Sequence, residues 1–350
     1  MLSRVERLRE CLKDNEAVLI SSYQNIFYYS GFTSEDANLL ISHDKQMLIT
    51  DSRYTIQARE QAPDFEIIDS VGSFKDIFKS ISASYIGFEE NYVSVNQHRK
   101  RQRDAGDEKM LVPMQKRIDA LRQIKDAEEI RRIAEAERIG DEAFSYILDK
   151  IKPGVTEREI ALELEFFMKK NGASALSFET IAASGVRSAM PHGAASQKVI
   201  EKGDLLTLDF GCVYEGYCSD MTRTVAVGSV DDRQREIYET VLKAQLAALD
   251  VIKPDMKCAE VDKTARDIIK AAGYGNNFGH SLGHSVGIEI HETPVFSTKS
   301  NDIVKAGHVI TVEPGIYVDG FGGVRIEDLV AVTENGIQNL THSPKELIVV

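Results

Sequence analysis

The sequence has little of what marks secreted, membrane-spanning or nucleic-acid-binding proteins. Only four of its 350 residues are cysteines, with no paired or Cys-x-x-Cys spacing, so we expect reduced thiols in a cytoplasmic protein rather than a disulfide framework. No apolar run approaches the roughly 18 residues of a membrane span. The charged first residues lack the apolar core of a secretory signal. The net charge of -13 disfavours nucleic acid and anionic membranes as partners.

The remaining composition is ordinary for a globular protein, with 43% hydrophobic and 28% charged residues, and 350 residues allow two domains. Short apolar strands alternate with helical segments up to about residue 118, which predicts a smaller α/β N-terminal domain with a mixed sheet. A polar stretch at 99–109, followed by Pro113, places the boundary there or shortly after. We therefore expect domains over 1–118 and 119–350.

Helix pairs followed by strands with unusual polar residues predict an α+β second domain, in which this pattern occurs roughly twice. Its expected helices are 125–151, 156–171, 232–253 and 258–272. The strands expected in the first domain are 17–20, 39–42, 46–50, 65–68 and 85–88, with helices at 2–12, 54–60 and 74–81.

Two aspartates, Asp209 and Asp220, are set into strand-like segments on either side of the turn Val213–Gly216. If the turn is centred between Tyr214 and Glu215, the two aspartates are directly opposite, with their Cβ atoms roughly 5 Å apart. Carboxylates this close repel, so either one stays protonated or a cation lies between them. A lone aspartate of this kind is more often a solvated turn residue, so the evidence for a site must come from downstream.

A second pair of carboxylates follows the same design. Glu313 ends an apolar strand, and Glu327 lies in another segment that otherwise indicates a buried strand. The intervening turn is centred on Gly320, which would place Glu313 opposite Glu327.

Three of the eight histidines, His280, His284 and His291, fall within twelve residues. Three glycines in this stretch disfavour a helix, so we expect a glycine-rich segment that enters a strand, with Ile288 and Ile290 on the face opposite His291. Histidine among carboxylates suits divalent Mn, Co, Zn or Fe rather than Ca.

Charge balance favours a site with two metal ions. Four carboxylates supply -4 and two divalent ions +4, so a bridging hydroxide leaves about -1, and a neutral His284 completes the set. Without a metal, four ionised carboxylates in one pocket would be strongly destabilising.

The five residues and their neighbours resemble the ligands of the pita-bread metallopeptidases, family M24, and among these the prolidase and aminopeptidase P group. The motifs are Asp209 in Leu-Asp-Phe-Gly, Asp220 in Ser-Asp-Met-Thr-Arg-Thr, His284 in Gly-His-Ser-Leu-Gly-His-Ser-Val-Gly, Glu313 in Thr-Val-Glu-Pro-Gly and Glu327 in Arg-Ile-Glu-Asp. The resemblance spans nearly the whole chain: residues 1–118, including Thr50-Asp51-Ser52-Arg53-Tyr54, resemble the group's creatinase/prolidase-type N-terminal domain. It implies that 119–350 form the pita-bread catalytic domain.

The resemblance also implies two divalent ions per subunit, with Mn²⁺ first and Co²⁺ or Zn²⁺ as alternatives. By it, Asp209 chelates one ion, Asp220 and Glu327 bridge both, and His284 with Glu313 hold the other.

Further roles follow from the same resemblance. His192 and His291 match the two substrate-site histidines, which hold the scissile carbonyl and the oxyanion. Glu313 is the implied proton shuttle from water to the leaving nitrogen. His280 matches a position just outside the ligands, and Arg325 one that pairs with acidic neighbours.

The implied activity is hydrolysis of the bond between an N-terminal residue and proline, by a hydroxide that bridges two divalent metals. Val295 stands where some prolidases have an arginine that could meet a dipeptide's free carboxylate, and this favours aminopeptidase P action on X-Pro-peptides. The alternative is a prolidase, an Xaa-Pro dipeptidase. Ser285 is a second departure, since many relatives have glycine there. The resemblance also implies a homodimer.

Two other functions fit less well. The N-terminal domain argues against a methionine aminopeptidase specificity. The complete set of five ligand types argues against a metal-free creatinase-like hydrolase or an inert binding module.

Overall fold

The computed structural model describes residues 2–70 and 72–350, and the chain divides into two compact units, Met1–Arg122 and Gln123–Val350. The boundary expected at residue 118 lies within helix α6 (Gln115–Gln123), shortly before this division. Among the described residues, no helix has the length and apolar character needed to cross a membrane.

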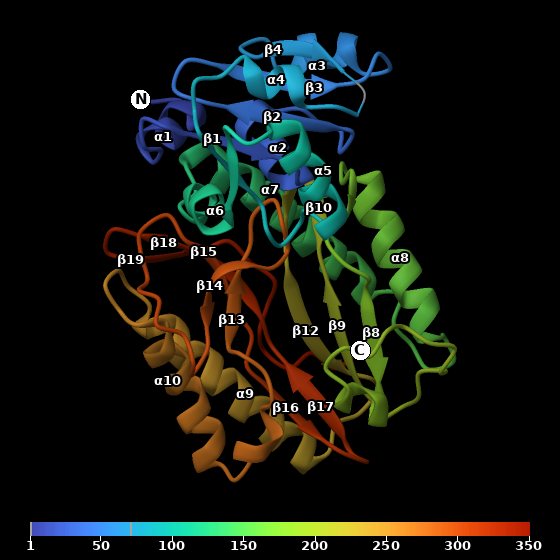
Figure 1. The fold of residues 1–350 in the computed structure, drawn as a ribbon. Coiled ribbons are helices and arrows are strands. Elements are labelled where there is room, and N and C mark those ends of the chain that lie inside the picture. The colour runs from blue at the N-terminus through green and yellow to red at the C-terminus, as the bar shows by residue number, and fades with distance from the viewer. Residues whose placement is uncertain (1, 71) are drawn as a thin grey trace. The chain divides into compact units, whose positions relative to one another are not determined.

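The first unit is built on a six-stranded mixed sheet, as expected (Figure 1). Its strands are β1 (Glu16–Ile20), β2 (Ala37–Ile41), β3 (Gln46–Thr50), β4 (Glu66–Asp69), β5 (Tyr85–Phe88) and β6 (Met110–Pro113). Their order in the sheet is β4-β3-β2-β1-β5-β6, and β1 pairs antiparallel with β2 and parallel with β5. Its other helices are α1 (Arg4–Glu10), α2 (Tyr23–Ser30), α3 (Thr55–Gln61), α4 (Lys75–Lys79) and α5 (Val95–Ala105).

The polar stretch 99–109, near which we expected the domain boundary, lies mostly in helix α5. Ser94 caps the helix because its side chain accepts a hydrogen bond from the Gln97 N–H, and the Gln97 side chain accepts one from the Ser94 N–H. Arg101 is the single buried side chain described in α5. The helix therefore has no apolar stripe by which its period could be recognised.

The second unit has two helix pairs, each packed on its own strands. The helices are α7 (Ala127–Leu148), α8 (Glu157–Lys170), α9 (Asp232–Val251) and α10 (Cys258–Ala271). All four expected helices are confirmed, including the capping box formed by Thr156 and Glu159 at the start of α8. The strands are β7 (Ala175–Leu176), β8 (Ile181–Ser184), β9 (Leu205–Phe210), β10 (Cys212–Tyr214), β11 (Tyr217–Cys218), β12 (Met221–Ala226), β13 (Gly283–Ser285), β14 (Glu292–Phe296), β15 (Val309–Val312), β16 (Gly315–Val318), β17 (Gly322–Arg325), β18 (Asp328–Thr333) and β19 (Gly336–Asn339).

Two hydrophobic cores hold these layers together. One joins α7 and α8 to the sheet β8-β9-β12, and the other joins α9 and α10 to β13–β18. In Figure 1 the strands of this unit lie between the two helix pairs. The predicted twofold α+β pattern is thus confirmed, and the strands that hold polar residues lie between the cores.

The predicted register of the first carboxylate pair is wrong. β9 and β12 pair Asp209 with Thr222 and Phe210 with Met221, so Asp209 is not directly opposite Asp220. The turn is centred one residue later than expected, at Glu215 and Gly216, because both have the positive φ of 46° and 84° that such a hairpin turn requires. Moving the turn by one residue shifts the pairing by two, which leaves both aspartates on the same face.

The register of the second pair is confirmed. β16 and β17 pair Gly315 with Arg325 and Val318 with Gly322, as a turn centred on Gly320 demands. Glu313 and Glu327 lie two residues beyond the pair Gly315 and Arg325, in the same register. The four cysteines are free, and all but Cys11 are buried, as expected of packing residues.

Gly211 tests how tightly the first hairpin is built, because a Cβ there would overlap the carbonyl oxygen of Ser219. We predict that Gly211→Ala destabilises the protein by about 2 kcal/mol or more, and lowers the midpoint of thermal unfolding by several degrees. The matched control is Gly279→Ala, whose added methyl group would meet no atom within 4 Å. Calorimetry that gave equal midpoints for the two variants would contradict this packing.

Candidate active site

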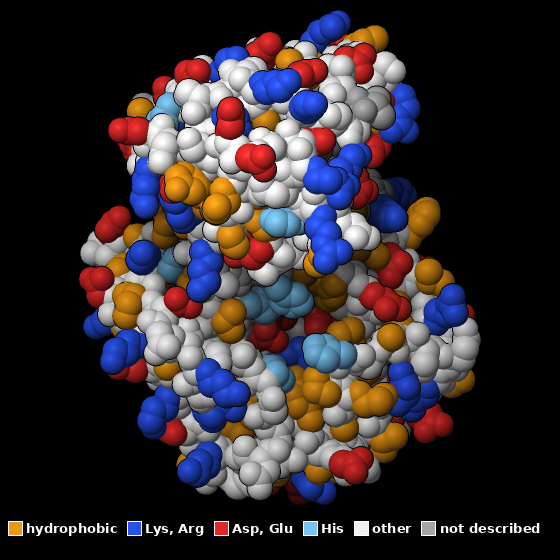
Figure 2. Space-filling model, in the orientation of Figure 1, with side chains coloured by type: hydrophobic (Ala, Val, Ile, Leu, Met, Phe, Trp, Pro, Cys, Tyr) orange, Lys and Arg blue, Asp and Glu red, His pale blue; other side chains and the backbone are white. Residues whose placement is uncertain are grey.

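The predicted site residues gather at one cavity of about 540 Å³ in the second unit. Figure 2 shows it as a hollow with histidines at its rim and carboxylates on its floor. β9 supplies Asp209, β13 supplies His284, and Asp220, Glu313 and Glu327 lie at strand ends. The remaining predicted residues that line the cavity are His192, His280, His291 and Arg325.

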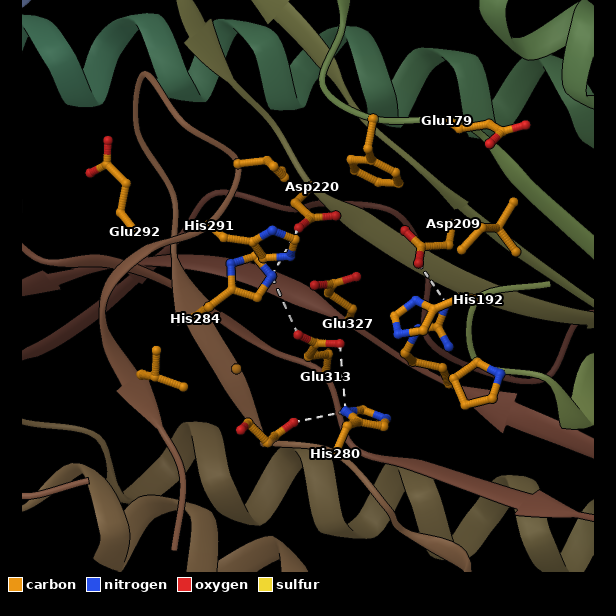
Figure 3. A pocket seen from close by; sticks show the side chains of 18 of the residues that line it. Glu179, His192, Asp209, Asp220, His280, His284, His291, Glu292, Glu313 and Glu327 are labelled. Carbon is orange, nitrogen blue, oxygen red and sulfur yellow. Dashed lines mark hydrogen bonds and ion pairs between the residues drawn. The ribbon is translucent and has the colours of Figure 1, made fainter. Parts of the chain in front are cut away.

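Three side chains converge at the centre, where Asp220, His284 and Glu327 each place one ligand atom within 4.8 Å of the other two. His284 Nε2 lies 3.4 Å from Asp220 Oδ2 and 3.5 Å from Glu313 Oε1. Figure 3 shows Glu313 beside this group, with Asp209 on its far side from His284.

Arg325 is the fixed cation of the cavity. Its three nitrogens donate to Asp209 Oδ2 at 2.5 Å, Tyr317 Oη at 2.7 Å and Thr222 Oγ1 at 3.0 Å. Burial alone would lower its pKa, but Tyr317, Asp209 and Glu313 outweigh this and raise the pKa above its ordinary value. Arg325 therefore stays charged, and each of its three nitrogens donates one hydrogen bond to the protein.

The carboxylates carry a strong electrostatic cost. Burial is the main cause that raises the pKa of Asp220, Glu313 and Glu327, and their mutual repulsion adds to it. For Glu327 the pKa rises to about 8, although Thr222 Oγ1 donates to it at 2.7 Å. One cation, Arg325, does not neutralise this group.

The two inner histidines are neutral, because burial lowers the pKa of both His280 and His284 to about 4. His284 Nδ1 faces the Ser285 carbonyl at 3.2 Å, which assigns the proton to Nδ1 and leaves the Nε2 lone pair directed at the carboxylates. His280 Nε2 faces Tyr317 Oη at 2.9 Å, and the His291 ring packs edge-on against His284 with centroids 4.4 Å apart.

These donors fit divalent metal ions. Asp209 Oδ1 is buried and finds no hydrogen-bond partner among the described residues. The His284 lone pair meets carboxylate oxygens, which have no proton to give it when ionised. Carboxylate oxygens and an imidazole nitrogen, whose negative charge Arg325 alone does not balance, are ligands that suit Mn²⁺, Co²⁺ or Zn²⁺.

The strand expected at Ile288 to His291 is wrong, since this segment is a series of bends before β14. A buried ion pair shapes it: Lys125 Nζ lies 2.8 Å from Glu292 Oε2, and the two residues are 4% and 8% exposed. The Glu292 carboxylate also accepts the Glu289 N–H at 3.3 Å and fills the space beside Gly287 where a Cβ would lie.

Sequence reasoning missed several residues that support the site. Thr222 donates to Glu327, and Thr311 Oγ1 lies 3.3 Å from Glu313 Oε1. The buried carboxyl of Glu137 accepts the Asp220 N–H at 3.2 Å and the Thr341 hydroxyl at 2.6 Å. Glu137 lies on the buried face of α7, and a charged residue at a core position of a helix was the signal that could have found it.

Comparison with known proteins identifies the family. The profile described as Metallopeptidase family M24 matches residues 131–334, more than half of the chain. This chain belongs to metallopeptidase family M24. The Creatinase/Prolidase N-terminal domain profile matches residues 4–124 of the M24 chain, in agreement with the expected N-terminal domain.

Relatives match the M24 chain over its whole length. It is 41% identical to the Xaa-Pro dipeptidase of Pyrococcus furiosus, over 99% of this chain and 100% of that one. A solved Xaa-Pro dipeptidase from Bacillus anthracis superposes with a TM-score of 0.96 at 43% identity, covering 99% of both chains. A solved X-Pro aminopeptidase from Thermotoga maritima superposes with a TM-score of 0.93 at 40% identity, covering 99% of this chain and 100% of that one.

The raised carboxylate pKa values predict a pH-dependent stability of the metal-free protein. Because the folded state then binds more protons than the unfolded chain, the free energy of unfolding falls as the pH rises through the folded pKa values. For Glu327 this window runs from its ordinary 4.5 to about 8. We expect the thermal unfolding midpoint of chelator-treated protein to decrease as the pH rises from about 5 to about 8. The decrease is measured relative to the midpoint of Mn²⁺-loaded protein at the same pH. A constant difference between the two midpoints would contradict this prediction.

Proposed function

We propose that this M24 chain is a metal-dependent Xaa-Pro dipeptidase, which hydrolyses the bond between an N-terminal residue and proline. The observation that supports it most is the single cavity shared by Asp209, Asp220, His284, Glu313 and Glu327. The named dipeptidases among its full-length relatives support the choice of substrate.

In this proposal Asp209 would hold one ion, His284 with Glu313 would hold the second, and Asp220 with Glu327 would be shared by the two. Bound there, the ions would supply Lewis acidity toward the scissile carbonyl and a lowered pKa for the attacking water. Mn²⁺ is our first choice of ion, with Co²⁺ or Zn²⁺ as alternatives. The homodimer and the cytoplasmic location stay predictions.

The protein's own groups orient the substrate and move protons. His192 and His291 line the cavity on two sides of the carboxylates and would hold the scissile carbonyl and the developing oxyanion. Glu313 would accept a proton from the attacking water and deliver it to the proline nitrogen. Arg325 fixes Asp209 through their 2.5 Å hydrogen bond.

Proline suits such a site because the X-Pro bond is a tertiary amide. It has no N–H, so an enzyme that binds its substrate through that donor cannot use it. A cavity that acts on the carbonyl needs no such donor. Ile181, Pro191, Ala194 and other apolar residues on the cavity wall would accept the ring.

The aminopeptidase P activity that Val295 favoured is now the second candidate. The relatives back the dipeptidase better, but Val295 does line the cavity, and each of the three Arg325 nitrogens already donates to an oxygen of the protein. The X-Pro aminopeptidase from Thermotoga maritima also keeps this candidate open.

The deciding experiment compares an X-Pro dipeptide with an X-Pro-Y tripeptide, in the presence of Mn²⁺ and again after chelation. We predict hydrolysis of the dipeptide, loss of activity on chelation and recovery when Mn²⁺ is restored. Preferential cleavage of the tripeptide would replace the dipeptidase with the aminopeptidase. Activity that a chelator leaves intact would contradict both.

Asp220→Ala tests the metal site itself. Because this carboxylate would bridge both ions, we expect at least a hundredfold loss of kcat together with a lower metal content, measured by atomic emission on purified protein. The matched control is Asp250→Ala, an exposed carboxylate on α9 away from the cavity. Two ions per Asp220→Ala subunit would overturn the assigned role.

A further inference from the structure

Glu179 is an unexplained carboxylate on the wall of the cavity. It is exposed, it lines the cavity, and it has no hydrogen bond or ion pair with any described residue. The other acidic residues of the wall are the proposed metal ligands and Glu292, which pairs with Lys125. Glu179 thus differs from them in being available to a group that enters from solution.

The backbone around Glu179 is fixed to the strand that bears Asp209. The Ser177 N–H donates to the Gly211 carbonyl at 3.0 Å, and Ile181 pairs with Asp209 in the ladder of β8 and β9. Thr180, between them, is 2% exposed. Because Glu179 and Ile181 both line the cavity, the backbone of Glu179 has a set position along the wall, at most about 7 Å from that of Ile181 at the rise of an extended chain.

The arrangement indicates which end of a substrate reaches Glu179. Ile181 forms a bridge on its other side with Ala194, two residues after His192. In Figure 3, Asp209 lies between Glu179 and His192. This inference rests on the proposed function, which assigns the scissile bond to the carboxylates and His192. With the bond there, the side chain of the residue before proline extends past Asp209 toward Glu179.

The chemistry of this wall selects for a cation. No lysine lines the cavity among the described residues, and Arg325 is committed to Asp209, Thr222 and Tyr317. A basic side chain is long enough to span the distance from the scissile bond, whereas the α-ammonium group stays next to it. We propose that Glu179 is a specificity-determining residue that favours lysine or arginine before proline.

The test is the ratio of kcat/KM for Lys-Pro to that for norleucyl-Pro, which has an uncharged side chain of similar length. We expect the ratio to fall roughly three- to fivefold in Glu179→Gln, the size of one partly exposed ion pair, and to fall in the unchanged protein as salt is added. Glu179→Lys should lower it further. The matched control is Glu239→Gln, which removes an exposed carboxylate of α9 outside the cavity.

Each outcome has one meaning. If Glu179→Gln lowers kcat/KM by the same factor for both substrates, the residue acts on the α-ammonium group and the proposal is overturned. If kcat/KM changes for neither substrate, the proposal is also overturned. A fall of the same size in Glu239→Gln would show a general effect of net charge and also overturn it. If the unchanged protein cleaves neither dipeptide, the proposed function fails; if it cleaves both without a change in ratio on mutation, only the role of Glu179 fails.

Discussion

Repulsion among buried carboxylates is the constraint on which the catalytic unit depends. Asp209, Asp220, Glu313 and Glu327 share one cavity, and one arginine is their permanent counter-charge. The burial that raises the pKa values of Asp220, Glu313 and Glu327 would turn these three into neutral acids if nothing else entered. The same burial makes a divalent ion a strongly favoured occupant, because in a medium of low dielectric constant its attraction to carboxylates is large.

The fold holds this unfavourable group in place with rigid elements on both sides. Two hairpin regions present the carboxylates, and a separate helix pair packs behind each half. Glu137 and Thr341 hold the backbone of Asp220, while Thr222 and Thr311 contact the carboxylates directly. Because Glu137, Thr222 and Thr311 lie on a helix and two strands with buried faces, the charged atoms have little freedom to move apart.

The sequence predicted the site better than its detailed geometry. Carboxylates within apolar strands are conspicuous, so the four candidate carboxylate ligands could be found, and His284 lies in a cluster of three histidines. The Gly320 turn was enough to define the second register. The first register failed by two residues, because Glu215 adopts a positive φ that its residue type does not announce. Helix α5 was missed since it has one buried side chain, and the pairing of Lys125 with Glu292 joins residues too distant in sequence for any local pattern to reveal.

That ion pair sets a limit on how the catalytic unit can be isolated. The M24 profile begins at residue 131, and a fragment cut there would retain α7 almost whole. It would lack Lys125, however, and leave Glu292 charged in the interior beside the segment that bears His291. Breaking a buried ion pair by removing one partner costs about 3–5 kcal/mol, a large share of the stability of most domains. The smallest fragment that keeps this ion pair therefore starts at or before Lys125, two residues ahead of α7 and six ahead of the family profile.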